Sequence, residues 1–167
     1  MPPTTIIYTD PRYRGGKLVN ESALLDEWLS RRYPAVPSLG RIRLGPTSAT
    51  VRGVTLPPNL ASMLQVLNWY PDAIVIAPGE QLVIEAKVTA KPAAIGEVLF
   101  YQHLIYRTAA LTPYIQTVFQ PVVLFAEDDP DVAAFARGLG VRVEIYTPAW
   151  IVSYMQTVQY KPRTGVV

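Results

Sequence analysis

The chain has 167 residues, of which 50% are hydrophobic and 17% are charged, and its formal net charge is +2. This length and composition are typical of one compact soluble domain with a real core, and the apolar stretches stop well short of the ~20 residues that a membrane span requires. The absence of cysteine excludes disulfides, thiolate nucleophiles and cysteine-bound zinc or iron–sulfur clusters, and a single histidine excludes a histidine-rich zinc site. We expect a single domain over residues 1–167 that binds no membrane. We also expect a cytoplasmic location, because no basic region followed by an apolar core opens the chain.

The first predicted element is a helix from Glu21 to about Tyr33, with Asn20 as its N-cap and Pro34 after its end. Its apolar face consists of Leu24, Leu25, Trp28 and Leu29. Glu21 falls near the centre of that face, so we expect it to point inward. The alternative is an ordinary first-turn acid favoured by the helix dipole.

The next segment carries basic residues in an alternating pattern. Arg41 and Arg43 alternate with Ile42 and Leu44, which predicts a short strand with both arginines on one face. Two arginines on one face suit contact with a phosphate backbone. Alternatively, they only make an apolar chain more soluble. Residues 45–62, rich in Pro, Gly and Thr, are interpreted as a long loop or short hairpin that borders a DNA groove.

A hairpin is the strongest pattern in the middle of the chain. Ala73–Ala77 and Leu82–Val88 are β-branched runs separated by Pro78-Gly79-Glu80-Gln81, which predicts two strands and a turn. Alternation sends Val83, Glu85 and Lys87 to one face of the second strand, and Leu82, Ile84, Ala86 and Val88 to the other.

Two carboxylates and an ammonium group are associated with this hairpin. Asp72 precedes its first strand, directly after Pro71, while Glu85 and Lys87 lie one pleat apart on the second. Mg²⁺ prefers oxygen ligands and often takes only one or two carboxylates, with water and substrate phosphate in its other positions. Asp72 and Glu85 meet that requirement, and Lys87 could orient an attacking water and offset charge on phosphorus. The alternative is that Glu85 and Lys87 form a solvated ion pair on an ordinary hairpin.

A helix is predicted from Ala93 to about Ala110. Glu97 shares an arc of it with a largely apolar set, namely Phe100, Tyr101, Leu104 and Thr108. A carboxylate there needs a partner, because unpaired buried charge is costly. We expect it to ligate a metal or water, or to form a salt bridge to Lys91 or Lys87. His103 lies away from it and is interpreted as a packing or surface residue.

The rest of the chain completes the fold. Thr117–Ala126 is predicted to be a strand, Pro130–Gly138 a helix and Val141–Tyr146 a further strand. Together with the earlier elements this order predicts an α/β fold, with a central mixed sheet, helices on both faces and the carboxylates near one sheet edge. The core is expected over about residues 17–150, with a flexible tail over about 160–167.

Two sequence motifs resemble those of a known family. Pro71-Asp72 followed by Glu85-x-Lys87 in a hydrophobic strand resembles the PD-(D/E)XK nuclease superfamily. Ile95-Gly96-Glu97-Val98-Leu99-Phe100-Tyr101 resembles the Gly-Gln-x-x-x-Tyr helix of its RecB-like branch, with Glu97 where that branch usually has glutamine. The substitution keeps an oxygen acceptor but adds charge and removes two donors.

The resemblance implies a restriction-endonuclease-like core and a deoxyribonuclease that uses Mg²⁺ or Mn²⁺. It implies that Asp72 and Glu85 hold the metal, that Glu21 and Glu97 complete or surround the site, that Lys87 orients the attacking water and that Tyr101 supports the helix. Arg41 and Arg43 are the candidate DNA contacts. The alternative is a nuclease-like fold that binds DNA or assembles without efficient cleavage. Because no recognition or motor domain accompanies the core, we also expect a homodimer or delivery by a larger complex, as in phage, mobile-element or repair systems.

Overall fold

The computed structural model describes residues 5–8, 19–34, 38–39, 42–45, 50–51, 54–55 and 69–159. Arg41 and the expected tail at 160–167 lie outside these ranges, as does most of the segment from 45 to 62. The helices and strands are, in chain order, β1 Thr5–Tyr8, α1 Val19–Arg32, β2 Ser38–Leu39, β3 Thr50–Val51, β4 Val54–Thr55, β5 Ala73–Ala77, β6 Glu80–Lys87, α3 Pro92–Ile105, η3 Ala109–Tyr114, β7 Gln120–Phe125, α4 Pro130–Gly138, β8 Arg142–Ile145 and α5 Ala149–Gln159.

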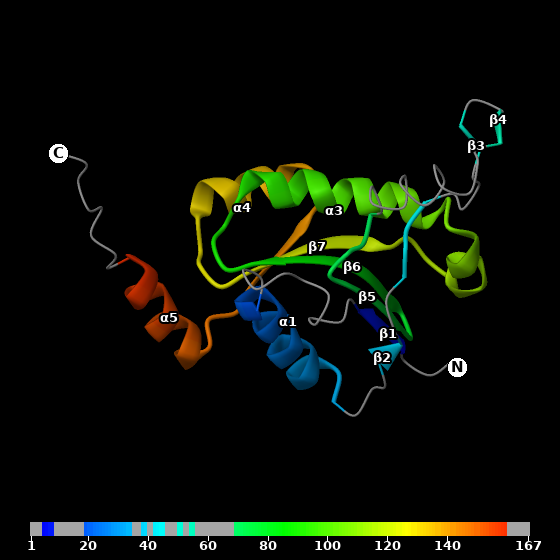
Figure 1. Cartoon of the computed structure of the whole chain (residues 1–167). Helices are drawn as coiled ribbons and strands as arrows, with labels where there is room; N and C mark the ends of the chain where they lie inside the picture. The colour runs from blue at the N-terminus through cyan, green and yellow to red at the C-terminus, as the bar shows by residue number, and fades with distance from the viewer. Residues whose placement is uncertain are drawn as a thin grey trace.

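A mixed sheet forms the centre of the molecule, with its strands in the order β2-β1-β5-β6-β7-β8 (Figure 1). β5 pairs antiparallel with both β1 and β6, whereas β6, β7 and β8 run parallel to one another. The predicted hairpin is therefore confirmed, although its turn is shorter than expected. β6 begins at Glu80, because Gly79 adopts a φ of 77° and closes the turn with Pro78.

Helices cover both faces of this sheet, as Figure 1 shows. α3 and α4 pack on one face over a buried cluster that includes Val83, Val98 and Phe125. α1 and α5 pack on the other face, over a cluster that includes Ile84 and Ile151. The α/β class with a mixed sheet and helices on both faces is thus confirmed. The expected position at a sheet edge is wrong, because β5 and β6 are interior strands.

α1 confirms the predicted amphipathic helix but begins earlier than expected. It starts at Val19, so Asn20 lies inside the helix and is not its N-cap. The predicted apolar face is buried, with Leu24 and Leu25 fully inaccessible to solvent. On the outer side, Glu27 accepts hydrogen bonds from Tyr146 Oη (2.6 Å) and Trp150 Nε1 (2.7 Å). These bonds attach the chain around α5 to α1.

α3 ends at Ile105, five residues before the end that the sequence predicted. Thr108 explains the early end, because its hydroxyl donates to Leu104 O (2.8 Å) and accepts from Gly45 N (2.8 Å). Such bonds from a threonine side chain compete with the helical ladder. Pro113 would also clash with a continued α-helix, and the chain forms the 3₁₀ helix η3 instead.

Of the two predictions for the segment before the β5–β6 hairpin, the strand is wrong and the short hairpin is confirmed. Ile42 and Arg43 form no strand, and only Leu44 makes an isolated antiparallel bridge, to Trp69. Ile42 packs against the core instead of alternating in a sheet. β3 and β4 pair as a two-stranded hairpin, which confirms the hairpin alternative for this stretch.

The predicted elements of the C-terminal half are confirmed, whereas η3 and α5 were not predicted. α4 spans the expected residues, Pro130–Gly138, and Asp129 caps it by accepting from Asp131 N and Val132 N. β7 begins at Gln120, three residues later than expected, and β8 covers Arg142–Ile145 within the predicted range. In the described part of the chain, none of the helices has the length and apolar character of a membrane span.

Candidate active site

Asp72 lies directly before β5, and β6 continues beyond this end of β5. Ala73 pairs with Ile84, so Asp72 lies across from Glu85 in the same register, and Asp72 N donates to Ile84 O (3.1 Å). Its carboxylate Oδ2 accepts from Ala86 N (2.8 Å). A buried backbone N–H requires an acceptor, and the aspartate supplies one where the neighbouring strand ends. Asp72 is thereby buried and fixed against the end of β6.

Glu85 lies on the face of β6 that α3 covers, and only 3% of it is exposed. Its Oε1 accepts from Lys87 Nζ, while Oε2 is buried with no hydrogen-bond partner among the described residues. Burial raises the pKa of Glu85 well above its usual value, and the charge of Asp72 raises it further, with a partial offset from Lys87. A contact with Glu97 also raises this pKa, so the site contains a buried carboxylate oxygen close to two further carboxylates.

Lys87 lies between two glutamates. It contacts Glu85 directly, and its Nζ is 3.6 Å from Glu97 Oε2. Burial alone would lower the pKa of Lys87, but the charges of Glu85, Asp72 and Glu21 outweigh burial and raise it. Lys87 is therefore a firmly charged ammonium group.

The predicted alternatives for Glu85, Lys87 and Glu97 can now be separated. Glu85 and Lys87 do form an ion pair, but a solvated surface pair is wrong, because Glu85 is buried. The salt bridge predicted from Glu97 to one of two lysines is confirmed for Lys87. Glu97 is less inward than expected, since 42% of its side chain is exposed, and Phe100 on the same stripe is exposed as well.

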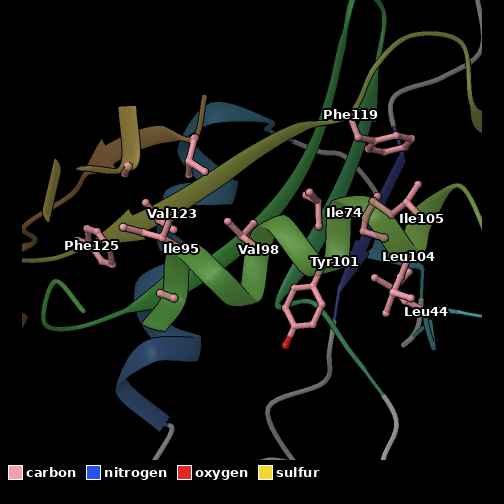
Figure 2. Close-up of a cluster of buried hydrophobic side chains, with 14 of the residues drawn as sticks. Leu44, Ile74, Ile95, Val98, Tyr101, Leu104, Ile105, Phe119, Val123 and Phe125 are labelled. Atoms are coloured by element: carbon pink, nitrogen blue, oxygen red, sulfur yellow. The ribbon is translucent and has the colours of Figure 1, made fainter. Parts of the chain in front are cut away.

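Tyr101 lies at the margin of the buried cluster over this face of the sheet, and Figure 2 shows its hydroxyl directed away from that cluster. Burial raises the pKa of Tyr101, and the nearby charges of Glu85, Glu97 and Asp72 raise it further. The ring therefore packs in the cluster between α3 and the sheet, and the hydroxyl lies outside that cluster. His103 is exposed, so of its two interpretations the surface residue is confirmed.

Glu21 and Arg43 approach this region from elsewhere in the chain. Glu21 is half-buried on α1, and its charge acts on Lys87, so the helix does bring it toward the site. Arg43 is half-buried, and its Nε has no hydrogen-bond partner in the described ranges. The bridge between Leu44 and Trp69 sets Arg43 beside Tyr70, two residues from Asp72. Arg41, its expected companion, lies outside the described residues.

The side chains present can accept a divalent cation. Across the described residues, no group of three or more His, Cys, Asp or Glu side chains forms a ready-made metal site. Two carboxylates suffice for Mg²⁺ when water and substrate phosphate fill the other positions. Asp72 and Glu85 lie opposite one another, and the buried Glu85 Oε2 lacks a partner that a cation would supply. The residues therefore fit a hard cation bound with its substrate.

Sequence reasoning missed one feature beside the site, the exposed indole of Trp69 just before Tyr70-Pro71-Asp72. A tryptophan directly before the motif, outside any apolar periodicity, was the available indication. In comparisons with known proteins, no family model, curated protein or solved structure matches this chain.

Proposed function

We propose that this protein is a metal-dependent deoxyribonuclease that hydrolyses DNA phosphodiester bonds with Mg²⁺ or Mn²⁺. The observation that carries the proposal is the buried, unpartnered Glu85 Oε2, which lies opposite Asp72 and beside the charged Lys87. A buried acceptor that lacks a partner is costly. A chain that keeps such an acceptor between a second carboxylate and an ammonium group has the donor set for a cation that acts on phosphate. The resemblance to PD-(D/E)XK nucleases at the same residues supports this interpretation.

The charge and position of each residue suggest its role in the proposed reaction. Asp72 and Glu85 would hold the cation, which when bound lowers the pKa of water and neutralises charge on a phosphoryl oxygen. Lys87, an ammonium group held against Glu85, donates hydrogen bonds and stabilises negative charge as the phosphorus is attacked.

The surrounding groups hold this arrangement in place. Glu97 contacts Lys87 from α3 and limits where the ammonium group can move. Tyr101 holds α3 against this face of the sheet with its buried ring. Arg43 places a half-buried guanidinium group beside Tyr70, where its positive charge attracts the phosphate backbone of the substrate.

Cleavage of labelled DNA with Mg²⁺, Mn²⁺ or a chelator tests the proposal. Glu85→Ala and Lys87→Ala should each reduce the metal-dependent rate by about 100-fold or more, the usual cost of a lost electrostatic contact in an active site. Lys91→Ala is the matched control, because Lys91 is an exposed lysine four residues after Lys87, and it should cleave at the wild-type rate. Circular dichroism verifies folding. Near-normal cleavage by folded Glu85→Ala or Lys87→Ala protein would refute the assignment.

A second function, a nuclease-like module that binds DNA without efficient cleavage, is favoured by one observation. Lys87 is engaged by two glutamates, one of which stands where the RecB-like branch usually has a neutral glutamine. An ammonium group held this way is less available to a phosphate. Calorimetry with Mn²⁺ separates the two functions, because tight binding that depends on Asp72 favours the enzyme, whereas no binding favours the module.

A further inference from the structure

An exposed group of aromatic rings lies beside the candidate site. Trp69 and Phe100 meet edge to face, with ring centroids 4.9 Å apart and planes at 80°. His103 lies nearly parallel to Phe100, at 19° and 6.5 Å between ring centroids. Trp69 is 47% exposed and Phe100 is 40% exposed. We call these three side chains the aromatic platform.

The platform is adjacent to the carboxylates along both segments that supply it. Trp69 precedes Asp72 by three residues, a stretch that spans at most about 11 Å. Phe100 follows Glu97 by three residues on α3, which is a rise of about 4.5 Å along the helix. Successive phosphates of a stacked strand are about 3.4 Å apart along the axis. A strand with one phosphate at the carboxylates would therefore place bases on the platform within a few nucleotides.

Cationic groups flank the same surface. Arg43, which is half-buried, is next to the residue that bridges to Trp69. Arg107, exposed, follows His103 in the turn after α3. Exposed aromatic faces combined with arginines are the features with which proteins bind single strands, since every base has a face that stacks. Paired bases in a duplex expose only their edges to such a surface.

We infer that the aromatic platform stacks unpaired nucleobases, so that the substrate is single-stranded DNA or a frayed DNA end and not an intact duplex. This inference rests on the proposed function for its choice of ligand. The platform sets which DNA enters, and Asp72, Glu85 and Lys87 act on the phosphate. It needs no chemistry of its own, so binding can be measured separately from cleavage.

The experiment measures binding of an oligothymidylate and of a duplex of equal length at one fixed salt concentration, in Ca²⁺ so that cleavage stays slow. Wild-type protein should prefer the single strand. Trp69→Ala and Phe100→Ala should each weaken single-strand binding by about 5- to 150-fold, the range seen when one stacking residue is lost, and should affect duplex binding much less. Trp69→Phe should retain most of the affinity, because it keeps a stacking ring. This variant also provides a test if Trp69→Ala is less stable than the wild type.

Phe135→Ala is the matched control, because Phe135 is an exposed phenylalanine on α4, away from the platform residues in the chain. It should bind both DNAs as the wild type does. Equal loss of single-strand and duplex binding in Trp69→Ala, or no loss in folded Trp69→Ala and Phe100→Ala proteins, would overturn the inference. A platform that serves a protein partner would give that second result. Cleavage is scored separately, so absent cleavage with platform-dependent single-strand binding refutes only the proposed function.

Discussion

Replacing Asp72 by asparagine should separate a metal ligand from a structural residue. Asparagine keeps an oxygen that can accept from Ala86 N, so the backbone contact at the end of β6 survives. Residues opposite one another in an antiparallel pair have Cβ atoms about 4.5–5.5 Å apart. Two charges about 5 Å apart repel by roughly 3 kcal/mol at an effective dielectric constant of about 20. Lys87 offsets part of the repulsion between Asp72 and Glu85.

We therefore expect Asp72→Asn to stabilise the metal-free protein by about 1–2 kcal/mol, which for a domain of this size is about 2–8 °C in Tm. Metal binding should instead stabilise the wild-type protein. At a free Mn²⁺ concentration about 100 times Kd, binding adds about 2.7 kcal/mol to the free energy of unfolding. That corresponds to a rise of about 5–11 °C, and Asp72→Asn should lose most of it together with cleavage.

Differential scanning calorimetry with chelator and with Mn²⁺ measures both shifts. Asp128→Asn is the matched control, because Asp128 is exposed in the loop before α4, and it should keep the wild-type Mn²⁺ shift. Asp72→Asn protein that retains the full Mn²⁺ shift would show that Asp72 is not a ligand. A fall in Tm of the metal-free Asp72→Asn protein by several degrees would show that its role is structural.

The other predictions concern neighbouring groups. Glu97→Gln, which introduces the glutamine of the RecB-like motif that this helix resembles, should weaken Mn²⁺ binding in calorimetry less than Asp72→Asn does. Equal weakening would make Glu97 a primary ligand. Arg43→Gln should reduce the slope of log affinity against log salt by about 0.7 on single-stranded DNA, the value for one phosphate contact, and an unchanged slope would exclude that contact. Burial raises the pKa of Glu80, but hydrogen bonds from Tyr33 and Arg142 lower it and hold it below its usual value of 4.5. The stability that this gives is complete above that pH and disappears as pH falls through the depressed pKa. Glu80→Gln should therefore lower the free energy of unfolding at neutral pH by about 1 kcal/mol. In thermal melts, the difference in Tm between this variant and the wild type should disappear at acid pH. A difference that stays the same at all pH values would contradict this linkage.

The sequence predicted those elements whose local patterns agree with the final packing. The β5–β6 hairpin has β-branched strands and a Pro-Gly turn, so its alternation also placed Glu85 and Lys87 on one face. α4 has Asp129 as a cap, Pro130 in its first turn and glycines near its end. In both elements the start, the end and the buried face are set by residues only a few positions apart.

The elements that were missed depend on distant contacts. α5 contains Trp150-Ile151-Val152, residues that favour a strand, and its helix is stabilised where Ile151 is buried and Trp150 bonds to Glu27 on α1. β1 has four residues and gains its pairing from β5, more than sixty residues later. The burial of Glu85 likewise requires α3 to cover β6, and the position of Arg43 requires a bridge between Leu44 and Trp69. A one-dimensional pattern does not contain these contacts.

The candidate site lies where β6 changes from pairing with two strands to pairing with one. β6 is paired on both sides through Ile84, with β5 on one side and β7 on the other, but beyond that point β5 has ended and Asp72 takes over the contact to Ala86. Pairing with β7 continues to Lys87, so the backbone that carries both charged side chains stays fixed. The buried clusters on the two faces hold this end of the strand against the repulsion between its carboxylates. Glu85 and Lys87 therefore lie where the backbone of β6 is held by β7 and the strand on its other side has ended, a position that keeps both side chains in a fixed geometry.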